Sequence, residues 1–237
     1  MKLELVYFPV RARTEVICMC LRYGKHEYTC KSVAEAYGEG WGAAVKEKTP
    51  WGQAPILFVD GEPVAQSGTL VRFAAGISGL TPTDPLAAAK CDAIFEATQD
   101  ASAINPIVNV YTVRPTPSLL TQQPSRVNPP PPPSQGDLFL EKKAALLASM
   151  PATLNRFTRH LGDGPFFLGA KPYYCDLAVY HIVSHVRLVD PALLADHDTL
   201  KLHMAAVEAL PGVKEYLAER PDCVGIGTKP MLKPKEI

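Results

Sequence analysis

Hydrophobic and polar residues alternate in two different ways along the first third of the chain. Four segments have the two-residue alternation or the short apolar run that is typical of strands: residues 3–8, 27–33, 56–59 and 63–65. Three segments have apolar residues three or four positions apart, as a helix with one buried face requires: residues 14–23, 41–48 and 67–77. The resulting order, β-α-β-α-β-β-α, predicts one mixed sheet flanked by helices.

Beyond residue 85 the strand patterns stop. Helical spacing continues in five segments: residues 86–113, 138–161, 175–189, 199–210 and 213–220. Helices with no strand between them predict a helix bundle. We therefore expect an α/β domain over residues 1–78, a linker over residues 79–84 and an all-helical domain over residues 85–237.

A proline-rich segment at about residues 114–136 fits neither half of the chain. It contains an uninterrupted proline run at positions 129–133, which cannot continue a helix and favours the extended polyproline conformation. We interpret the segment as an insertion between two helices, which places it at one end of the bundle. The alternative is that the proline run binds a polyproline-recognising partner.

The charge balance narrows the range of partners. The chain has 237 residues, of which 24 are basic and 24 are acidic, so its formal charge is zero. This balance gives no electrostatic support for a nucleic-acid or anionic-membrane partner. No apolar stretch approaches the length of a membrane-spanning helix, and the chain starts with a short alternating run that contains Glu4. We therefore expect a cytoplasmic protein.

The cysteines and histidines do not form a metal-binding pattern. The six cysteines include no C-x-x-C pair, and Cys18 and Cys20 would point to different faces of a helix. Reduced, partly buried thiols are expected. His181 and His185 would share one helix face, but their segment lacks the glutamate of a zinc-peptidase helix. No metal site is expected.

Residues 52–69 combine a hairpin with the start of a helix. Asp60 and Gly61 form the expected tight turn, and Ser67 is placed to cap the helix, whose unpaired N–H groups can bind a carboxylate. Ala54 keeps backbone groups that an extended peptide can pair with, while the sequence does not decide whether its bond to Pro55 is cis. We interpret the segment as a peptide-binding device. An ordinary hairpin with a capped helix fits the same residues equally well.

Several motifs, taken in order, are similar to those of the cytosolic glutathione transferases. They are the opening run from Leu5 to Pro9, Arg13-x-Glu15, Trp41 with Lys46 or Lys48, the run from Gly52 to Pro55, Gln66-Ser67, and Asp100. The chain most resembles the tyrosine-type classes, especially sigma, with mu, pi and alpha as relatives. This resemblance covers nearly the whole chain except the proline-rich segment. It implies a thioredoxin-like N-terminal domain, an all-helical C-terminal domain and a homodimer.

The resemblance also implies a role for each matching residue. Tyr7 would be the catalytic hydroxyl and Arg13 a supporting charge beside it. The remaining glutathione contacts would be Trp41 and Lys46 at the glycyl end, Gln53, Ala54 and Pro55 at the cysteinyl part, Gln66 and Ser67 at the γ-glutamyl carboxylate, and Asp100 at the γ-glutamyl amine of the neighbouring subunit. The wall of the electrophile pocket would consist of Phe8, Tyr111 and Arg114. Lys48 is the alternative to Lys46, because the alignment is loose between residues 34 and 50.

The chemistry explains why a tyrosine would be used. The thiolate is the nucleophile, and an ordinary cysteine thiol has a pKa of about 8.5. Lowering this pKa by about two units requires roughly 2.7 kcal/mol of selective thiolate stabilisation. A hydrogen bond to a charged acceptor supplies about 1.5 to 3 kcal/mol. Neutral Tyr7 could therefore supply most of the stabilisation, and Arg13 with nearby helix dipoles would add the rest. Tyr7 should stay protonated.

Two positions depart from the family pattern. Arg11 stands in a turn where a glycine is usual, and we expect its charge near the mouth of the electrophile pocket. At the start of the helix over residues 175–189, Tyr173 replaces the usual Ser or Thr cap. Asp176 is still expected to accept a hydrogen bond from the Tyr173 backbone N–H.

The expected function is conjugation of glutathione, as co-substrate and without a metal, to small hydrophobic electrophiles, as in detoxification. One alternative is a sigma-like glutathione-dependent isomerase or peroxidase. Another is a non-catalytic structural or interaction relative in which the proline run is the binding element. A thiol reductase is disfavoured, because Tyr7 or Phe8 holds the place of its cysteine and Cys18 lies well inside the helix.

Overall fold

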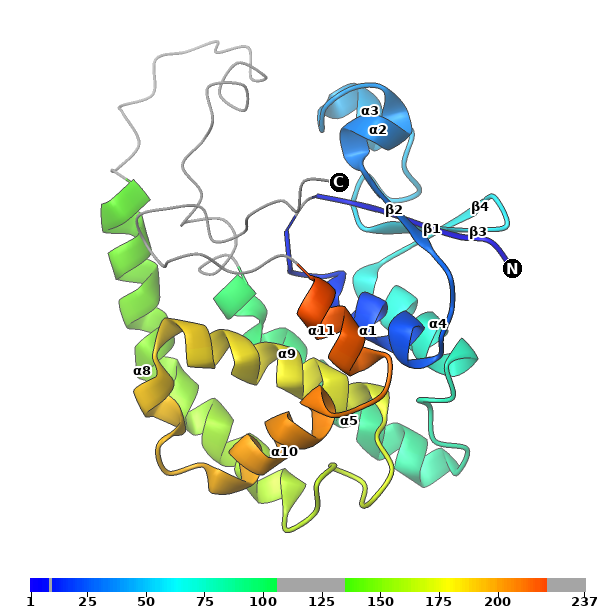
Figure 1. The fold of residues 1–237 in the computed structure, drawn as a ribbon. Helices are drawn as coiled ribbons and strands as arrows, with labels where there is room; N and C mark the ends of the chain where they lie inside the picture. Colours follow the sequence, from blue (N-terminus) through cyan, green and yellow to red (C-terminus); the bar gives the residue numbers. More distant parts are fainter. Residues whose placement is uncertain (9, 106–134, 221–237) are drawn as a thin grey trace.

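The computed structural model describes residues 1–8, 10–105 and 135–220, without the side chains of residues 135–140 and 142. Figure 1 shows a small sheet beside a larger group of helices. The described part therefore has the two kinds of structure that the hydrophobic patterns predict. Tyr111, Arg114, Cys223 and the proline run at residues 129–133 lie outside the described residues.

The sheet is mixed, as predicted. Its strands are β1 (Leu3–Tyr7), β2 (Thr29–Ser32), β3 (Ile56–Val59) and β4 (Glu62–Ala65). They lie in the order β2-β1-β3-β4. β1 is parallel to β2 and antiparallel to β3, and β3 pairs with β4 as the expected hairpin. The first strand is therefore central, and Tyr7 stands at its end.

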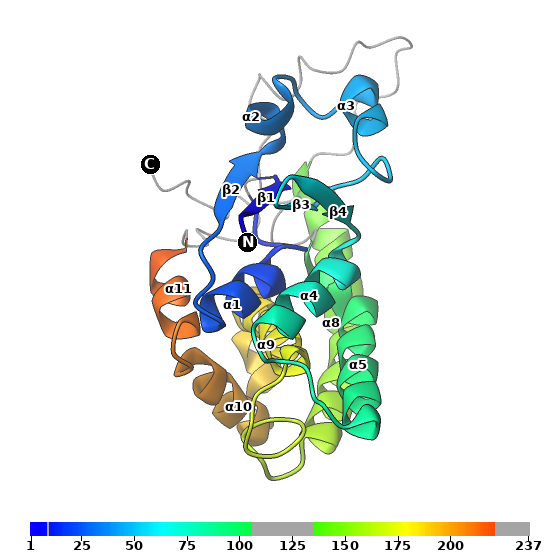
Figure 2. The same ribbon diagram turned by 90° about the vertical axis from the view of Figure 1, so that its right-hand side faces the viewer.

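The two faces of the sheet carry different side chains, because successive residues of a strand point to opposite faces. Leu3, Leu5 and Leu57 belong to the main hydrophobic core. Helices α1 (Glu15–Tyr23) and α4 (Ser67–Ile77) cover this face and pack against each other. Figure 2 shows both helices below the sheet, between it and the helices of the second half of the chain.

The opposite face of the sheet carries a smaller apolar cluster. Val6 and Ile56 meet Val33 and Val45 there. These last two residues belong to the short helices α2 (Val33–Tyr37) and α3 (Ala43–Glu47). The hydrophobic pattern does not predict α2. Its signal is a capping box, in which Ser32 and Glu35 exchange side-chain-to-backbone hydrogen bonds.

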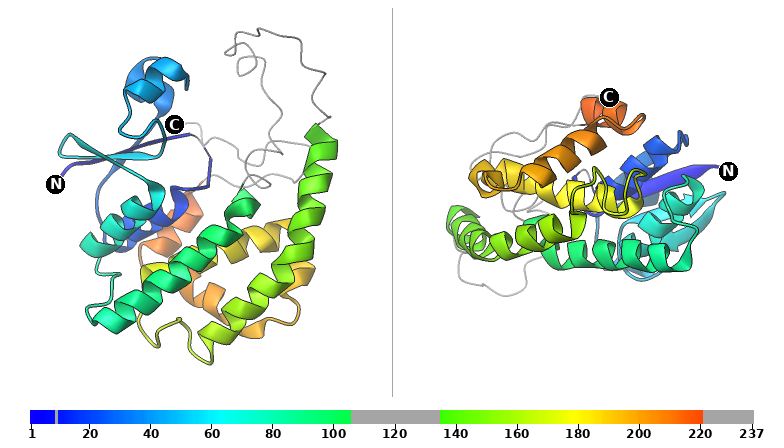
Figure 3. Two further views of the ribbon diagram at one scale, coloured as in Figure 1. Left: turned by 180° about the vertical axis from the view of Figure 1, so that it is seen from behind. Right: turned by 90° about the horizontal axis from the view of Figure 1, so that it is seen from below.

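The second half of the described chain is helical, as predicted. It consists of α5 (Pro85–Asp100), α8 (Gln135–Leu161), α9 (Tyr174–Val189), α10 (Asp198–Glu208) and α11 (Val213–Glu219), with 3-10 turns at Ala101–Ala103 and Pro191–Leu194. The predicted helix over residues 86–113 is interrupted by the first of these turns. Figure 3 (left) shows α5 and α8 running alongside one another in front of α9. Helix α9 is buried along nearly its whole length and packs against α1, α4, α5, α8 and α10.

A buried carboxylate anchors the start of α9. Asp176 accepts hydrogen bonds from the backbone N–H groups of Tyr173 and Phe167, both at 2.8 Å. The expected bond to Tyr173 is therefore confirmed. The Tyr173 side chain makes no capping bond, and the second oxygen of Asp176 instead ties down the loop that precedes α9.

The expected linker, residues 79–84, lies between the end of α4 and the start of α5. The boundaries of the two domains stay a prediction. Within the described residues, none of the helices combines the length and the apolar character that crossing a bilayer requires.

Candidate active site

Two cavities meet at the end of β1. The first, which we call the hairpin pocket, has a volume of about 450 Å³. It is lined by Tyr7, Phe8, Arg13, Trp41, Lys46, Gly52, Gln53, Ala54, Pro55, Gln66 and Ser67. The second, which we call the helical pocket, has a volume of about 590 Å³ and extends from the loop after β1 to α4, α5 and α9. Tyr7, Phe8, Arg13 and Ser67 line both cavities.

The hairpin pocket brings together most of the residues that the resemblance assigns to glutathione. They come from the end of β1, the segment around α3, the residues before β3 and the first turn of α4. Of the predicted glutathione contacts, Asp100 stands apart. It ends α5 and lines the helical pocket.

The two candidate lysines lie in different surroundings. Lys46 lines the hairpin pocket, and its Nζ lies 5.8 Å from the centre of the Trp41 ring. The Nζ of Lys48 lies 2.8 Å from a carboxylate oxygen of Glu39. The charge of Lys48 is thus engaged outside the pocket.

The start of α4 differs from the sequence-based expectation. Ser67 is the first residue of the helix, and Gln66 occupies the capping position without a side-chain capping bond. The expected cap at Ser67 is therefore wrong. Because Gln66 has a φ of 75°, the backbone turns at Gln66, and α4 begins one residue earlier than a cap at Ser67 would allow. The Ser67 hydroxyl instead accepts a hydrogen bond from Arg13 Nη1 at 3.3 Å, and the Ala54–Pro55 peptide bond is cis.

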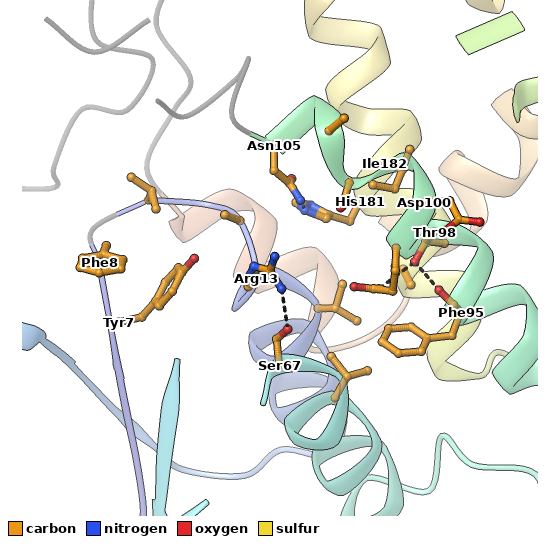
Figure 4. A pocket seen from close by; sticks show the side chains of 18 residues that line it. Tyr7, Phe8, Arg13, Ser67, Phe95, Thr98, Asp100, Asn105, His181 and Ile182 are labelled. Carbon is orange, nitrogen blue, oxygen red and sulfur yellow. Dashed lines mark hydrogen bonds between the residues drawn. The ribbon is translucent and has the colours of Figure 1, made fainter. Parts of the chain in front are cut away.

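Tyr7 lies at the junction of the two pockets. Burial raises the pKa of its phenol, whereas a hydrogen bond from the Arg13 backbone N–H and the charge of Arg13 act in the opposite direction. The net shift is upward, so the phenol is neutral at pH 7 and its proton can be donated. Figure 4 shows Tyr7 beside Phe8, with Arg13 bonded to Ser67 close by.

The helical pocket is walled mainly by apolar side chains, among them Val16, Val71, Phe95 and Ile182. Its polar groups include Thr98, Asn105 and His181. The sequence did not predict these residues as pocket residues, because they come from helices far apart in the chain. Of the expected wall, Phe8 lines the pocket, and Tyr111 and Arg114 lie outside the described residues.

His181 has one hydrogen-bond partner in this pocket. Its Nε2 lies 3.0 Å from Oδ1 of Asn105. Burial is the main cause that lowers the pKa of His181 to about 4, so the ring is neutral at pH 7. The rings of His181 and His185 are 4.3 Å apart. Among the described residues, no group of three potential ligands could hold a metal ion.

Arg11 does not lie where the sequence suggested. Its side chain is buried and lines neither pocket, so the expected charge at the pocket mouth is wrong. The guanidinium instead acts on the carboxylate of Glu15 inside the molecule. Attraction to this buried carboxylate favours the buried position of Arg11.

The five described cysteines are free thiols. Four of them are buried and Cys30 is exposed. Cys18 lies in α1 and lines neither pocket.

Comparisons with known proteins agree with this architecture. The family model described as glutathione S-transferase, C-terminal domain, matches residues 137–220. A relative in Caenorhabditis elegans, probable glutathione S-transferase 6, is 29% identical over 92% of this chain and 97% of its own length. The hematopoietic prostaglandin D synthase of Gallus gallus is 27% identical over 92% of this chain and 96% of its own length.

Solved structures share the fold. The structure of rat hPGDS complexed with a quinoline superposes with a TM-score of 0.73 at 22% identity, covering 94% of this chain and 98% of the other. At this identity the likeness concerns the fold, which is a thioredoxin-like domain joined to a helical domain. Together with the sequence similarities, it supports a cytosolic glutathione S-transferase and therefore an enzyme.

Proposed function

We propose that this enzyme conjugates the thiol of glutathione to small apolar electrophiles. Glutathione occupies the hairpin pocket and the electrophile occupies the helical pocket. The observation that carries the proposal is that Tyr7, Phe8, Arg13 and Ser67 line both cavities. A sulfur atom held at the Tyr7 end of the hairpin pocket faces the cavity in which the second substrate lies.

The hairpin pocket offers a counterpart for each part of the tripeptide. The first turn of α4 presents unpaired N–H groups, and Gln66 and Ser67 lie there to receive the γ-glutamyl carboxylate. Gln53 and the backbone of Ala54 precede the edge of the hairpin and pair with the cysteinyl part. Trp41 and Lys46 receive the glycyl carboxylate, to which Lys46 brings a positive charge.

Tyr7 stabilises the thiolate as a hydrogen-bond donor. Its raised pKa supports this role, because a phenol that stays neutral keeps a proton to donate to the sulfur anion. Arg13 adds a positive charge on the same side of the pocket, and its guanidinium is fixed by Ser67. The apolar walls of the helical pocket favour electrophiles with a hydrophobic body.

A change of one oxygen atom tests the role of Tyr7. Tyr7→Phe removes one hydrogen bond to a charged acceptor, so we expect kcat with a chromogenic aryl halide to fall about ten- to a hundredfold at pH 7. Glutathione affinity, measured by calorimetry, should stay within about twofold of that of the unmodified enzyme. The matched control is Tyr37→Phe in α2, a tyrosine that lines neither pocket. Equal kcat values for Tyr7→Phe and the unmodified enzyme would remove Tyr7 from this role.

A second candidate function is isomerisation with glutathione as a recycled cofactor, and the likeness to a prostaglandin D synthase favours it. The same thiolate serves both reactions. Conjugation consumes one glutathione per product, whereas isomerisation returns it. Counting the free thiol while a prostaglandin precursor is converted separates the two functions.

We extend the proposal to assembly and location. Asp100 lines the helical pocket of its own chain and not the hairpin pocket, which supports its contact with glutathione bound to the other subunit of a homodimer. The free thiols of the described cysteines support a cytoplasmic enzyme of detoxification.

A further inference from the structure

Glu15 is a buried charge next to the proposed active site. It is the first residue of α1, two positions after Arg13, and it is only 2% exposed. A carboxylate in such a place must be paired, because an isolated buried charge is strongly destabilising.

The partners of Glu15 come from the other end of the described chain. The Tyr216 hydroxyl donates a hydrogen bond to Glu15 Oε2 at 2.9 Å. Arg220, directly after α11, forms an ion pair and a hydrogen bond with Glu15 Oε1. Figures 1 and 2 both show α11 lying against α1. The C-terminal helix therefore holds the first turn of α1.

Further charged and titratable groups surround this carboxylate. Burial raises the pKa of Glu15, but the charge and the hydrogen bond of Arg220, together with the charge of Arg11, outweigh it, so the net pKa is lowered. Burial lowers the pKa of His185, which follows His181 on α9, and the charges of Arg11 and Arg220 lower it further. The Glu15 carboxylate therefore stays ionised at pH 7 and can form its ion pair with Arg220.

The same short segment contacts Tyr7. Arg13 lines both pockets with Tyr7, its backbone N–H and its charge lower the pKa of the Tyr7 phenol against the effect of burial, and its guanidinium donates to Ser67. Between Arg13 and Glu15 there is only Thr14, which is itself buried. A displacement of Glu15 is therefore passed on to the group that contacts the phenol.

We propose that Glu15 is a positioning residue, through which Tyr216 and Arg220 of the C-terminal region hold Arg13 in place against Tyr7. This inference rests on the proposed function of Tyr7 as the donor to the glutathione sulfur. It adds a dependence of the thiolate site on side chains that lie outside both pockets.

The chain contains a matched control. Arg22, in the last turn of α1, pairs with Glu219 of α11 at 2.5 Å. This pair joins the same two helices, but its side chains are 34% and 61% exposed. It lies at the opposite end of α1 from Arg13. Removing it weakens the contact between α1 and α11 without touching the first turn of α1.

Tyr216→Phe is the principal test, because it deletes one hydroxyl and leaves the ion pair in place. We expect the thiol pKa of bound glutathione, followed by ultraviolet absorbance of the thiolate, to rise by about half a unit, and kcat at pH 7 to fall about 1.5-fold as the ionised fraction of the thiol decreases. The rate should recover at higher pH, and KM for glutathione should stay within about twofold. Glu219→Gln should leave the thiol pKa unchanged. An unchanged thiol pKa in Tyr216→Phe, or an equal shift in Glu219→Gln, would overturn the proposal.

A second pair of variants covers the ion pair. Arg220→Lys keeps the charge and should retain most of the thiol pKa shift, whereas Arg220→Met should raise the thiol pKa further than Tyr216→Phe does. If both Arg220 variants behave alike, the charge of Arg220 has no positioning role and this part of the proposal fails.

Hydrogen exchange of the free protein separates this inference from the proposed function. The backbone amides of residues 11–15 should exchange faster in Tyr216→Phe than in Glu219→Gln, whether or not glutathione binds. Unchanged exchange in this segment would reject the positioning role. An unmodified enzyme that fails to lower the thiol pKa would instead reject the proposed function.

Discussion

The hairpin pocket and the helical pocket meet at Tyr7 but are built in different ways. The hairpin pocket uses residues between Tyr7 and Ser67, several of them in short runs such as Gln53 to Pro55. The helical pocket collects side chains from Tyr7 to Ile182, and most of its walls are apolar. The first arrangement suits a ligand whose charges and peptide groups are always the same. The second imposes shape and hydrophobicity and leaves room for varied ligands.

The largest expected effect comes from the anchor of α9, a helix that lines only the helical pocket. Asp176→Ala removes the acceptor of two buried backbone N–H groups, so the free energy of unfolding should fall by about 3 kcal/mol in urea titrations. Asp198→Ala, which removes an exposed carboxylate paired with Lys201, should leave it nearly unchanged, because water screens an exposed ion pair. Similar losses in both variants would contradict the anchoring role.

The buried histidine of the helical pocket should make stability depend on pH. The folded pKa of His181 is about 4, below the ordinary value of about 6.5. As the pH falls from 6.5 to 4, the unfolded chain therefore takes up a proton that the folded chain refuses, and stability decreases. The contribution is on the order of 3 kcal/mol.

His181→Gln should flatten the dependence of unfolding free energy on pH in this range. The exposed His160 provides the control, because His160→Gln should leave the slope as it is. The hypothesis is rejected if the slope of His181→Gln equals that of the unmodified protein.

A pair of substitutions can separate the two pockets kinetically. Gln53→Ala, at a residue that lines the hairpin pocket and not the helical pocket, should raise KM for glutathione about fivefold, because a hydrogen bond to the cysteinyl part is lost. Ala103→Phe places a ring in the helical pocket from an exposed position. It should raise KM for a bulky electrophile several-fold without changing KM for glutathione. If either variant changes KM for glutathione and KM for the electrophile equally, the two pockets do not bind separate substrates.

The smallest effect distinguishes the two lysines near α3. Lys46→Met should raise KM for glutathione by about threefold, since one exposed charge is removed from the hairpin pocket. Lys48→Met should have no effect, because Lys48 pairs with Glu39. The reverse order would assign the contact to Lys48.

The same contrast explains what the sequence could predict. The spacing of apolar residues predicts β1, α1 and the hairpin, because each of these elements buries one face and that burial produces a regular pattern within a few residues. Helix α2 was missed although Ser32 and Glu35 carry its capping signal. Ser67 was expected to be a cap, but one unusual backbone angle, at Gln66, moves the helix start.

Other features depend on contacts that no local pattern contains. Arg11 is buried, and its charge acts on Glu15, whose hydrogen-bond partners are about two hundred residues away. His181 attracted attention only as a possible metal ligand, and its place in the helical pocket follows from the packing of α9 against α5. Such positions are decided by tertiary structure and cannot be derived from residue spacing.

The contact between Glu15 and Tyr216 spans 201 positions of the chain, and this has a consequence for biosynthesis. During translation the sheet and α1 emerge long before α11 has been made, and contacts of such long range form late. A nascent chain could thus assemble its tripeptide-binding edge early while its first helix still lacked the partner that fixes it. Full activity would then arise only after α11 has left the ribosome and packed against α1.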